Sequence, residues 1–111
     1  MKDKNSVQLI GYVGADPAIK NYQNGNKCAR MRIATHSPVK KKAEQDEQKY
    51  TTSWHTVIAW DKCAAFAERN FLKGSHILVD GYLVYRSYEN KSGVKVSVTE
   101  IKATSLINLD R

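Results

Sequence analysis

The seven residues from Trp54 to Trp60 constrain the fold of this chain more than any other stretch of its sequence. As a β-strand, this run places every second side chain on a common face, because successive residues point to opposite sides. One face then carries Trp54, Thr56, Ile58 and Trp60, and the other carries His55, Val57 and Ala59. Steps of about 3.3 Å per residue separate the two indoles by roughly 20 Å. The run predicts a strand with a pair of tryptophans on one side.

Two interpretations of this tryptophan pair compete. Two tryptophans on the same face of a strand in a small β domain are more often core residues. The chain, however, contains 18 Lys and Arg against 11 Asp and Glu, a formal net charge of +7, which suits a polyanionic partner. Flat rings among basic side chains are what sequence-tolerant single-strand binding needs, since bases stack on the rings and cations neutralise the phosphates. We therefore interpret the indoles as exposed stacking surfaces.

Other segments also have the alternation of strands. The residues from Val7 to Val13 predict a first strand, and Asn24-Gly25 predicts a turn. The residues from Lys27 to Thr35 predict a second strand, with Arg30 and Arg32 facing solvent and a core face formed by Ala29, Met31 and Ile33. Between this strand and the tryptophan strand, which we place at 51–60, residues 37–50 predict a charged loop. At 111 residues, the chain is expected to form a single domain over 1–111.

One convincing helix follows the tryptophan strand. It is predicted from Lys62 to Leu72, with Asp61 as its cap and Gly74 as the left-handed residue after its end. A fourth strand is predicted over 76–83, and its continuation over 84–88 pairs with a fifth over 94–101 across a turn at 90–93. Five strands with one helix between the third and the fourth are the arrangement of the OB-fold, a partly open Greek-key barrel in the mainly β class.

Several classes of function are disfavoured by what the sequence lacks. Cys28 and Cys63 form no CxxC and have no histidine at metal-ligand spacing, so we expect buried thiols and no metal or cofactor. No apolar leader or membrane span is recognisable, which favours a cytoplasmic protein without a membrane partner. No nucleophile, paired carboxylate or phosphate-binding glycine loop appears at a known spacing, so we do not expect an enzyme.

With this order of strands and helix, the chain resembles the bacterial single-stranded DNA-binding proteins, an OB-fold family. VQLIGYVGADP is similar to the family's opening strand, and NGN precedes the second strand as in its first hairpin. SWHTVIAWDKCAAFAERNFLKGSHILVDGYL resembles the family's central motif almost position by position. The resemblance covers residues 6–107. It implies a non-enzymatic protein that coats and protects single-stranded DNA in replication, recombination and repair, in the bacterial cytoplasm near the nucleoid.

The resemblance also implies site residues. Base-stacking aromatics fall on Trp54, Trp60 and Tyr88, whereas Val39 stands where the family often has a further tryptophan. Basic positions along the family's DNA path match Lys20, Lys40, Lys42, Lys62, Lys73 and Arg86, to which we add the solvent-facing Arg30 and Arg32. Family members are usually homotetramers, and His55 matches an interface position. The residues alone leave His55 open between an interface contact and a hydrogen-bonded core imidazole.

The largest departure from the family is at the C-terminus, where the usual flexible linker and acidic tip are absent. A shortened piece, a natural short paralogue and a relative with a different role all fit this difference. If the tip is natively absent, we expect DNA coating without recruitment of the usual partners. The alternatives are a dimeric accessory protein resembling primosomal replication protein N, which bridges replication proteins, and an RNA-binding domain of the cold-shock type. A dimer in solution would favour bridging, and a tetramer would favour coating.

Overall fold

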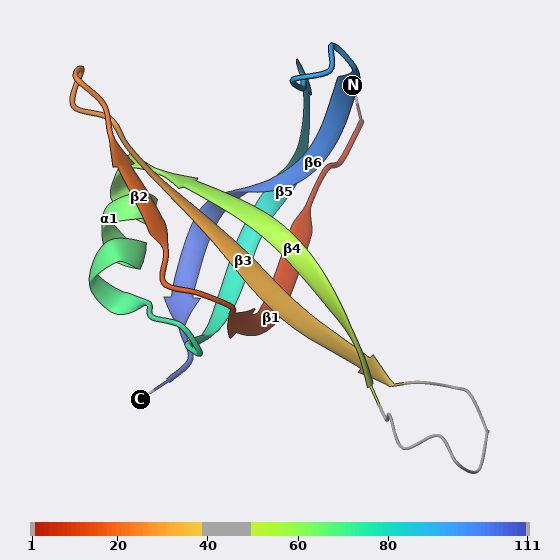
Figure 1. Ribbon diagram of the computed structural model, residues 1–111. Helices are drawn as coiled ribbons and strands as arrows, with labels where there is room; N and C mark the ends of the chain where they lie inside the picture. Colours follow the sequence, from red (N-terminus) through yellow and green to blue (C-terminus); the bar gives the residue numbers. More distant parts are fainter. Residues whose placement is uncertain (1, 39–49, 111) are drawn as a thin grey trace.

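The computed structural model describes residues 2–38 and 50–110, which consist mainly of β-strands (Figure 1). The elements in chain order are β1 (Val7–Val13), β2 (Ala18–Asn21), β3 (Lys27–Pro38), β4 (Tyr50–Trp60), α1 (Asp61–Asn70), β5 (His76–Glu89) and β6 (Lys95–Asn108). The predicted strands correspond to β1, β3, β4, β5 and β6. The short β2 was not predicted as a strand, so the helix lies between β4 and β5 rather than between a third and a fourth strand.

The strands form one sheet in the order β1-β5-β6-β4-β3-β2. A further pairing of β1 with β3, at Tyr12–Ala34 and Val13–Ile33, brings the sheet back on itself. Five strands therefore close a barrel, and β2 is added at the edge of β3. Most neighbouring strands are antiparallel, but β4 and β6 are parallel where Val57 lies opposite Ile101. This closure confirms the OB-fold predicted from the sequence.

Gly11 allows β1 to cross close to β3. A Cβ atom at this position would lie 2.3 Å from the carbonyl oxygen of Ala34, far inside van der Waals contact. Because glycine has no side chain, the two backbones can approach without displacing each other. Gly11 thus permits the closure of the barrel at the crossing of β1 and β3.

The barrel interior is filled by the inward-facing residues of the strands. The predicted core residues Ala29, Met31 and Ile33 are buried, as are Val57 and Ala59 of β4. Helix α1 packs its buried Ala64 and Ala67 against this core, and Phe71 follows directly after it. Figure 1 shows α1 beside one end of the barrel.

The helix begins differently from the prediction. It spans Asp61–Asn70 rather than 62–72, and its N-cap is Trp60, which makes no side-chain capping hydrogen bond. The prediction that Asp61 caps the helix is therefore wrong: Asp61 is its first residue, with a φ of 53°, and its carboxylate accepts a hydrogen bond from the backbone N–H of Lys27 at 3.1 Å. Gly74 has a left-handed φ of 92°, but it lies in the turn before β5 and not directly after the helix.

Four strands extend beyond their predicted ends, β5 by the single residue Glu89. Pairing of β3 with β4 continues to Pro38 and Tyr50, so the predicted loop 37–50 is shorter at both ends, and residues 39–49 lie outside the described residues. The last strand continues past 101 to Asn108, where it still pairs with β5. The β2–β3 hairpin and the β5–β6 hairpin both project from the barrel, toward the top of Figure 1.

Candidate nucleic-acid interface

The outward face of β3 and β4 carries the predicted aromatic and basic residues together. On β4, Val57 and Ala59 are buried in the core, whereas Trp54 is 49% exposed. The antiparallel register sets the outward residues of the two strands opposite one another, as the pairs Cys28–Trp60, Arg30–Ile58, Arg32–Thr56 and Ala34–Trp54. We call these eight residues the groove face. Along this outward face, two neighbouring arginines of β3 thus lie between the two tryptophans of β4.

Trp54 lies between an arginine and a glycine. The guanidinium carbon of Arg32 is 4.9 Å from the centre of the indole, which is a cation–π distance. On the β1 side, a Cβ atom at Gly14 would lie 2.5 Å from the ring. The absence of a side chain at Gly14 therefore lets the indole lie against the backbone. Gly14, Arg32 and Trp54 line a common pocket of about 270 Å³.

Trp60 lies at the other end of the groove face and is partly buried. Its ring is 5.8 Å from that of Tyr22 in the β2–β3 turn, at an interplanar angle of 33°. The ammonium group of Lys20 lies 5.1 Å from the centre of the Tyr22 ring. Cys28 is adjacent to these rings, and burial raises the pKa of its thiol. An exposed tyrosine therefore extends the aromatic surface beyond Trp60.

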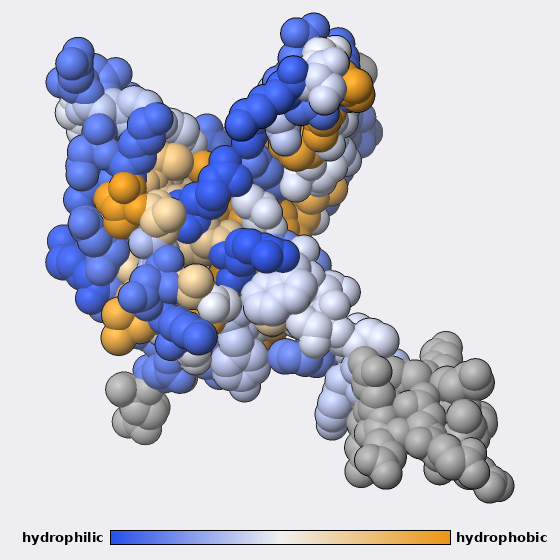
Figure 2. Space-filling view, in the orientation of Figure 1, coloured by the Kyte–Doolittle hydropathy of each residue, from blue (hydrophilic) through white to orange (hydrophobic). Residues whose placement is uncertain are grey.

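A cavity of about 300 Å³ lies between the two projecting hairpins. Figure 2 shows the hollow between them, in which hydrophilic surface lies beside hydrophobic patches. Its walls come from β3, β4, β5 and β6 and include Trp60, Tyr22 and the side chains of two arginines. Arg30 also lines the neighbouring pockets beside Trp54 and beside Lys20. The pockets thus adjoin one another along the groove face, with Arg30 common to them.

Two arginines meet at one carboxylate in this cavity. Arg86 donates from Nε to Oε1 of Glu100 at 3.2 Å and from Nη2 to Oε2 at 3.0 Å, and Arg30 donates from Nη1 to Oε2 at 3.3 Å. The hydrogen bonds from Arg86 hold the pKa of Glu100 below its usual range, against the opposing effect of burial. The same contact raises the pKa of Arg86. The cluster therefore carries two cations and one anion.

Comparison with known proteins places the chain in a family. A model described as "Single-strand binding protein family" matches residues 4–109.

The chain belongs to the single-strand binding protein family.

A curated relative, single-stranded DNA-binding protein 1 of Chlorobaculum tepidum, is 32% identical over 103 residues. The match covers 92% of this chain but 62% of the relative, so the chain spans less than two thirds of that protein's length. A solved structure described as "Plasmodium falciparum SSB complex with ssDNA" is similar with a TM-score of 0.85 and 30% identity, and the match covers 99% of this chain and 98% of the other.

Within this member of the single-strand binding protein family, the structure gathers most of the described candidate residues. Tyr88 is 46% exposed near the end of β5, and the guanidinium carbon of Arg86 lies 5.9 Å from its ring centre. Each of three exposed rings, Trp54, Tyr22 and Tyr88, therefore has a cation beside it. This pairing is the geometry expected where rings stack on bases and cations contact phosphates.

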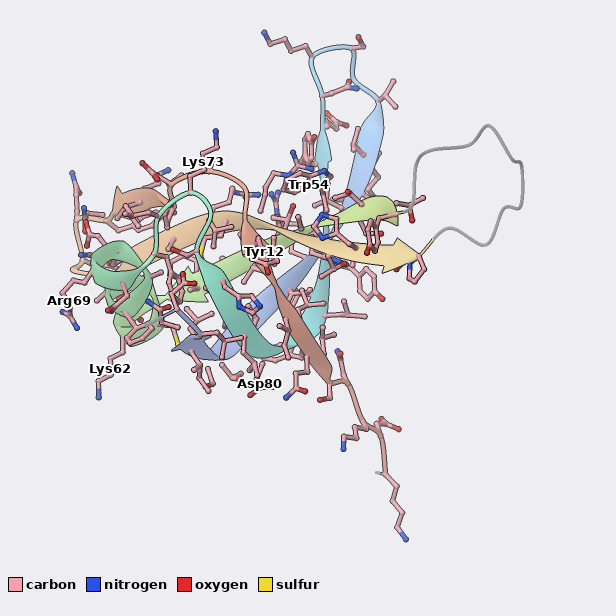
Figure 3. The ribbon with its side chains drawn as sticks, turned by 90° about the horizontal axis from the view of Figure 1, so that it is seen from below. Tyr12, Trp54, Lys62, Arg69, Lys73 and Asp80 are labelled. Atoms are coloured by element: carbon pink, nitrogen blue, oxygen red, sulfur yellow. The ribbon has the colours of Figure 1, made fainter. Side chains whose placement is uncertain are left out.

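Other candidates lie apart from this surface or outside the described residues. Lys62 projects from α1 toward the side opposite Trp54, whereas Lys73 projects toward the side of Trp54 (Figure 3). Lys40, Lys42 and Val39 lie outside the described residues. His55 is partly buried, and its Nε2 shares a hydrogen bond of 2.9 Å with the hydroxyl of Thr35. Both partners of that bond belong to this chain, so it gives His55 a role within the protomer.

Two residues of the interface were missed by the sequence reasoning. Tyr22 stands next to the Asn24-Gly25 turn, where a tyrosine has no periodic pattern that marks it as functional. Its position after Lys20 in a basic chain is the one signal that could have found it. Glu100 occupies an outward position of β6, where an acidic residue ordinarily indicates a solvated side chain. Only the meeting of β3, β5 and β6 shows that it is buried between two arginines.

The described residues offer neither a metal site nor a membrane-spanning helix. Within residues 2–38 and 50–110, no three histidine, cysteine or acidic side chains are grouped so that they could hold a metal ion. In the same ranges, no helix is long and apolar enough to cross a membrane. Cys28 and Cys63 are free thiols, each partly exposed rather than fully buried as the sequence predicted.

Proposed function

We propose that this chain binds single-stranded DNA with little dependence on base sequence. The observation that carries the proposal is that three exposed rings each have a cation beside them, above all Trp54 with Arg32 at 4.9 Å. Family membership supports it, as does the similarity to the Plasmodium falciparum SSB complex with ssDNA. The curated relative is likewise named a single-stranded DNA-binding protein.

In this mechanism, bases stack on the rings of Trp54, Trp60 and Tyr88, and Tyr22 is added to them. Stacking contributes about 1–3 kcal/mol per base and tolerates every base, because each base has a flat π face. A duplex hides these faces within its own stack, so the same surface selects single strands. The mechanism requires no bond to be made or broken in the DNA, and we propose that the protein coats it without catalysis, during replication, recombination and repair.

Phosphate groups are assigned to the cations beside the rings. We propose Arg30, Arg32 and Arg86 in the groove, Lys20 beside Tyr22, and Lys73 on the same side as Trp54. Lys40 and Lys42 remain predictions on the strength of the resemblance. Lys62, which points to the opposite side, has less support as a direct contact and contributes through the net charge of +7. Neutralised phosphates release counterions, so binding weakens as salt rises.

We also propose that the chain assembles into a homo-oligomer, with a tetramer favoured over a dimer. The support is a surface on the outer side of β1 and β5 that exposes large apolar side chains, with Ile10 53% and Tyr12 46% exposed. We call this the β1–β5 face and define it by Gln8, Ile10, Tyr12, His76, Leu78, Asp80 and Ile107. In addition, β3 pairs with β1 only at Tyr12 and Val13. In the described residues, the earlier part of β1 thus has one edge open to a strand of another copy.

The experiment that tests DNA binding is a titration of the tryptophan fluorescence with poly-dT. It is carried out at low and high salt and in competition with duplex DNA. We expect strong, saturable quenching that persists in part at high salt and is not competed by duplex. Weak quenching that disappears with salt would contradict stacking and leave only a charge interaction. Competition with poly-U tests whether RNA is bound equally well.

A further inference from the structure

We propose that Glu100 is a built-in competitor of the DNA phosphates, which occupies two groove arginines and thereby limits the affinity for single strands. The inference rests on the proposed function, because it concerns the same groove. Its basis is the position of Glu100 in the cavity between the two hairpins, in contact with both Arg30 and Arg86.

The burial of Glu100 distinguishes it from the other acidic residues. Its side chain is 7% exposed, and it is the one buried charged residue in the part of the chain that the structure describes. A buried carboxylate is costly unless cations and hydrogen bonds compensate it. Here the compensation comes from Arg30 and Arg86, whose side chains are themselves 49% and 47% exposed. The two cations therefore lie between a buried anion and the open groove.

The hydrogen bonds occupy the donors that a phosphate would use. Arg86 donates from Nε and Nη2 to the two oxygens of Glu100. Arginine adopts this two-bond geometry with carboxylates and phosphates alike. Arg30 donates one Nη1 hydrogen to the same carboxylate. A strand in the groove must either displace these bonds or use the remaining donors of each guanidinium. In both cases the carboxylate opposes the phosphate, and the cluster offers one net positive charge instead of two.

The consequence is a protein whose affinity is lower than its arginines could provide. For single strands, the logarithm of the binding constant falls with the logarithm of the salt concentration by about 0.7 per neutralised phosphate. If two proteins bind equally at about 1 M salt, the one with one more uncompensated positive charge therefore binds about five-fold more tightly at about 0.1 M salt. The gain should shrink as salt rises, which separates it from any change in base stacking.

The test compares the wild-type chain with Glu100→Gln in titrations with a dT oligomer at several salt concentrations. Glutamine keeps the size of the side chain and removes its charge. We expect about five-fold tighter binding at about 0.1 M salt and a salt slope steeper by about 0.7. Equal or weaker binding with an unchanged slope overturns the inference, while binding by the wild type would still stand. Absence of binding by the wild type overturns the proposed function and this inference together.

A matched control and a second pair of variants complete the test. Glu68→Gln changes the net charge equally and frees Lys27 from an ion pair on the surface of α1, so we expect less than about a two-fold effect. An equal gain from Glu68→Gln attributes the effect to net charge and overturns the inference.

If Glu100→Gln fails to fold, the single variant Arg86→Gln is compared with the double variant Arg86→Gln/Glu100→Gln. In the double variant, no buried charge faces the altered position on β5. The double variant should bind about five-fold more tightly than Arg86→Gln; equal affinity overturns the inference.

Discussion

The groove face and the β1–β5 face both expose aromatic rings, but they differ in what surrounds those rings. Trp54 and Tyr12 are 49% and 46% exposed, so exposure alone does not separate them. Trp54 lies beside the guanidinium of Arg32, whereas the ring of Tyr12 is stacked on His76 at 4.6 Å with an interplanar angle of 13°. The residues that define the β1–β5 face include no lysine or arginine. The proposed nucleic-acid surface thus differs from the proposed protein-contact surface in its neighbouring cations rather than in its exposed rings.

The largest expected effect comes from placing a charge on the β1–β5 face. Ile10 is 53% exposed and pairs with Leu78, which in turn pairs with the exposed Ile107. If another copy covers this face, it buries the exposed half of Ile10, so Ile10→Asp loses about 0.8–1.5 kcal/mol of apolar burial per copy and adds the cost of a desolvated carboxylate. Light scattering should show a lower mass in solution while the circular dichroism of the β-barrel is retained. An unchanged mass would mean that this face takes no part in assembly.

The next effect concerns the groove face. Trp54→Ala should weaken binding of poly-dT by about 1–3 kcal/mol, because one stacking ring is lost. Tyr12→Leu is the matched control, since it removes a ring of similar exposure from the β1–β5 face and keeps an apolar side chain there. Fluorescence anisotropy of a labelled dT oligomer measures both. Equal losses in the two variants would abolish the distinction between the faces, and no loss in a folded Trp54→Ala would remove the stacking assignment.

A smaller effect is expected from the cation beside Trp54. Arg32→Gln should make the salt dependence of binding shallower by about 0.7 in its logarithmic slope, which amounts to about five-fold at about 0.1 M salt. Arg69→Gln on α1 provides the control, because Arg69 projects away from Trp54 in Figure 3. Salt titrations of dT binding compare the two variants. A slope that changes equally in both would indicate that the total charge, and not the groove, determines affinity.

The smallest effect is on stability at low pH. The pKa of Glu100 is lowered from 4.5 by its hydrogen bonds to Arg86, so the ion pairs stabilise the folded state above that value and are lost as pH falls through the lowered pKa. In Glu100→Gln, the free energy of unfolding should therefore fall less steeply as the pH decreases. Urea unfolding from about pH 7 down to about pH 3 measures this change. A fall of unchanged steepness would show that other carboxylates dominate acid unfolding.

Much of this architecture could be predicted from the sequence, because alternation is a local property. The shared face of Ala29, Met31 and Ile33, and their burial, follow from alternation along one strand. Alternation also puts Trp54 and Trp60 on one face, but the exposure of Trp54 was predicted from the net positive charge of the chain. The role of Asp61 could not be predicted, since its carboxylate bonds to the backbone of Lys27, which is distant in sequence. Glu100 was missed for the same reason: its burial depends on arginines from two other strands. Contacts between strands, rather than patterns within them, account for what sequence reasoning did not find.

Gly14 has a consequence for anyone who wishes to redesign the specificity of this protein. The residue has no side chain to offer a ligand, so an alanine scan of groove side chains would pass over it. Yet any other amino acid would place a Cβ atom 2.5 Å from the Trp54 ring. The height of the ring above the groove is thus set by the backbone that follows β1. A combinatorial library that varies Arg32, Trp54 and their neighbours should therefore hold position 14 constant as glycine.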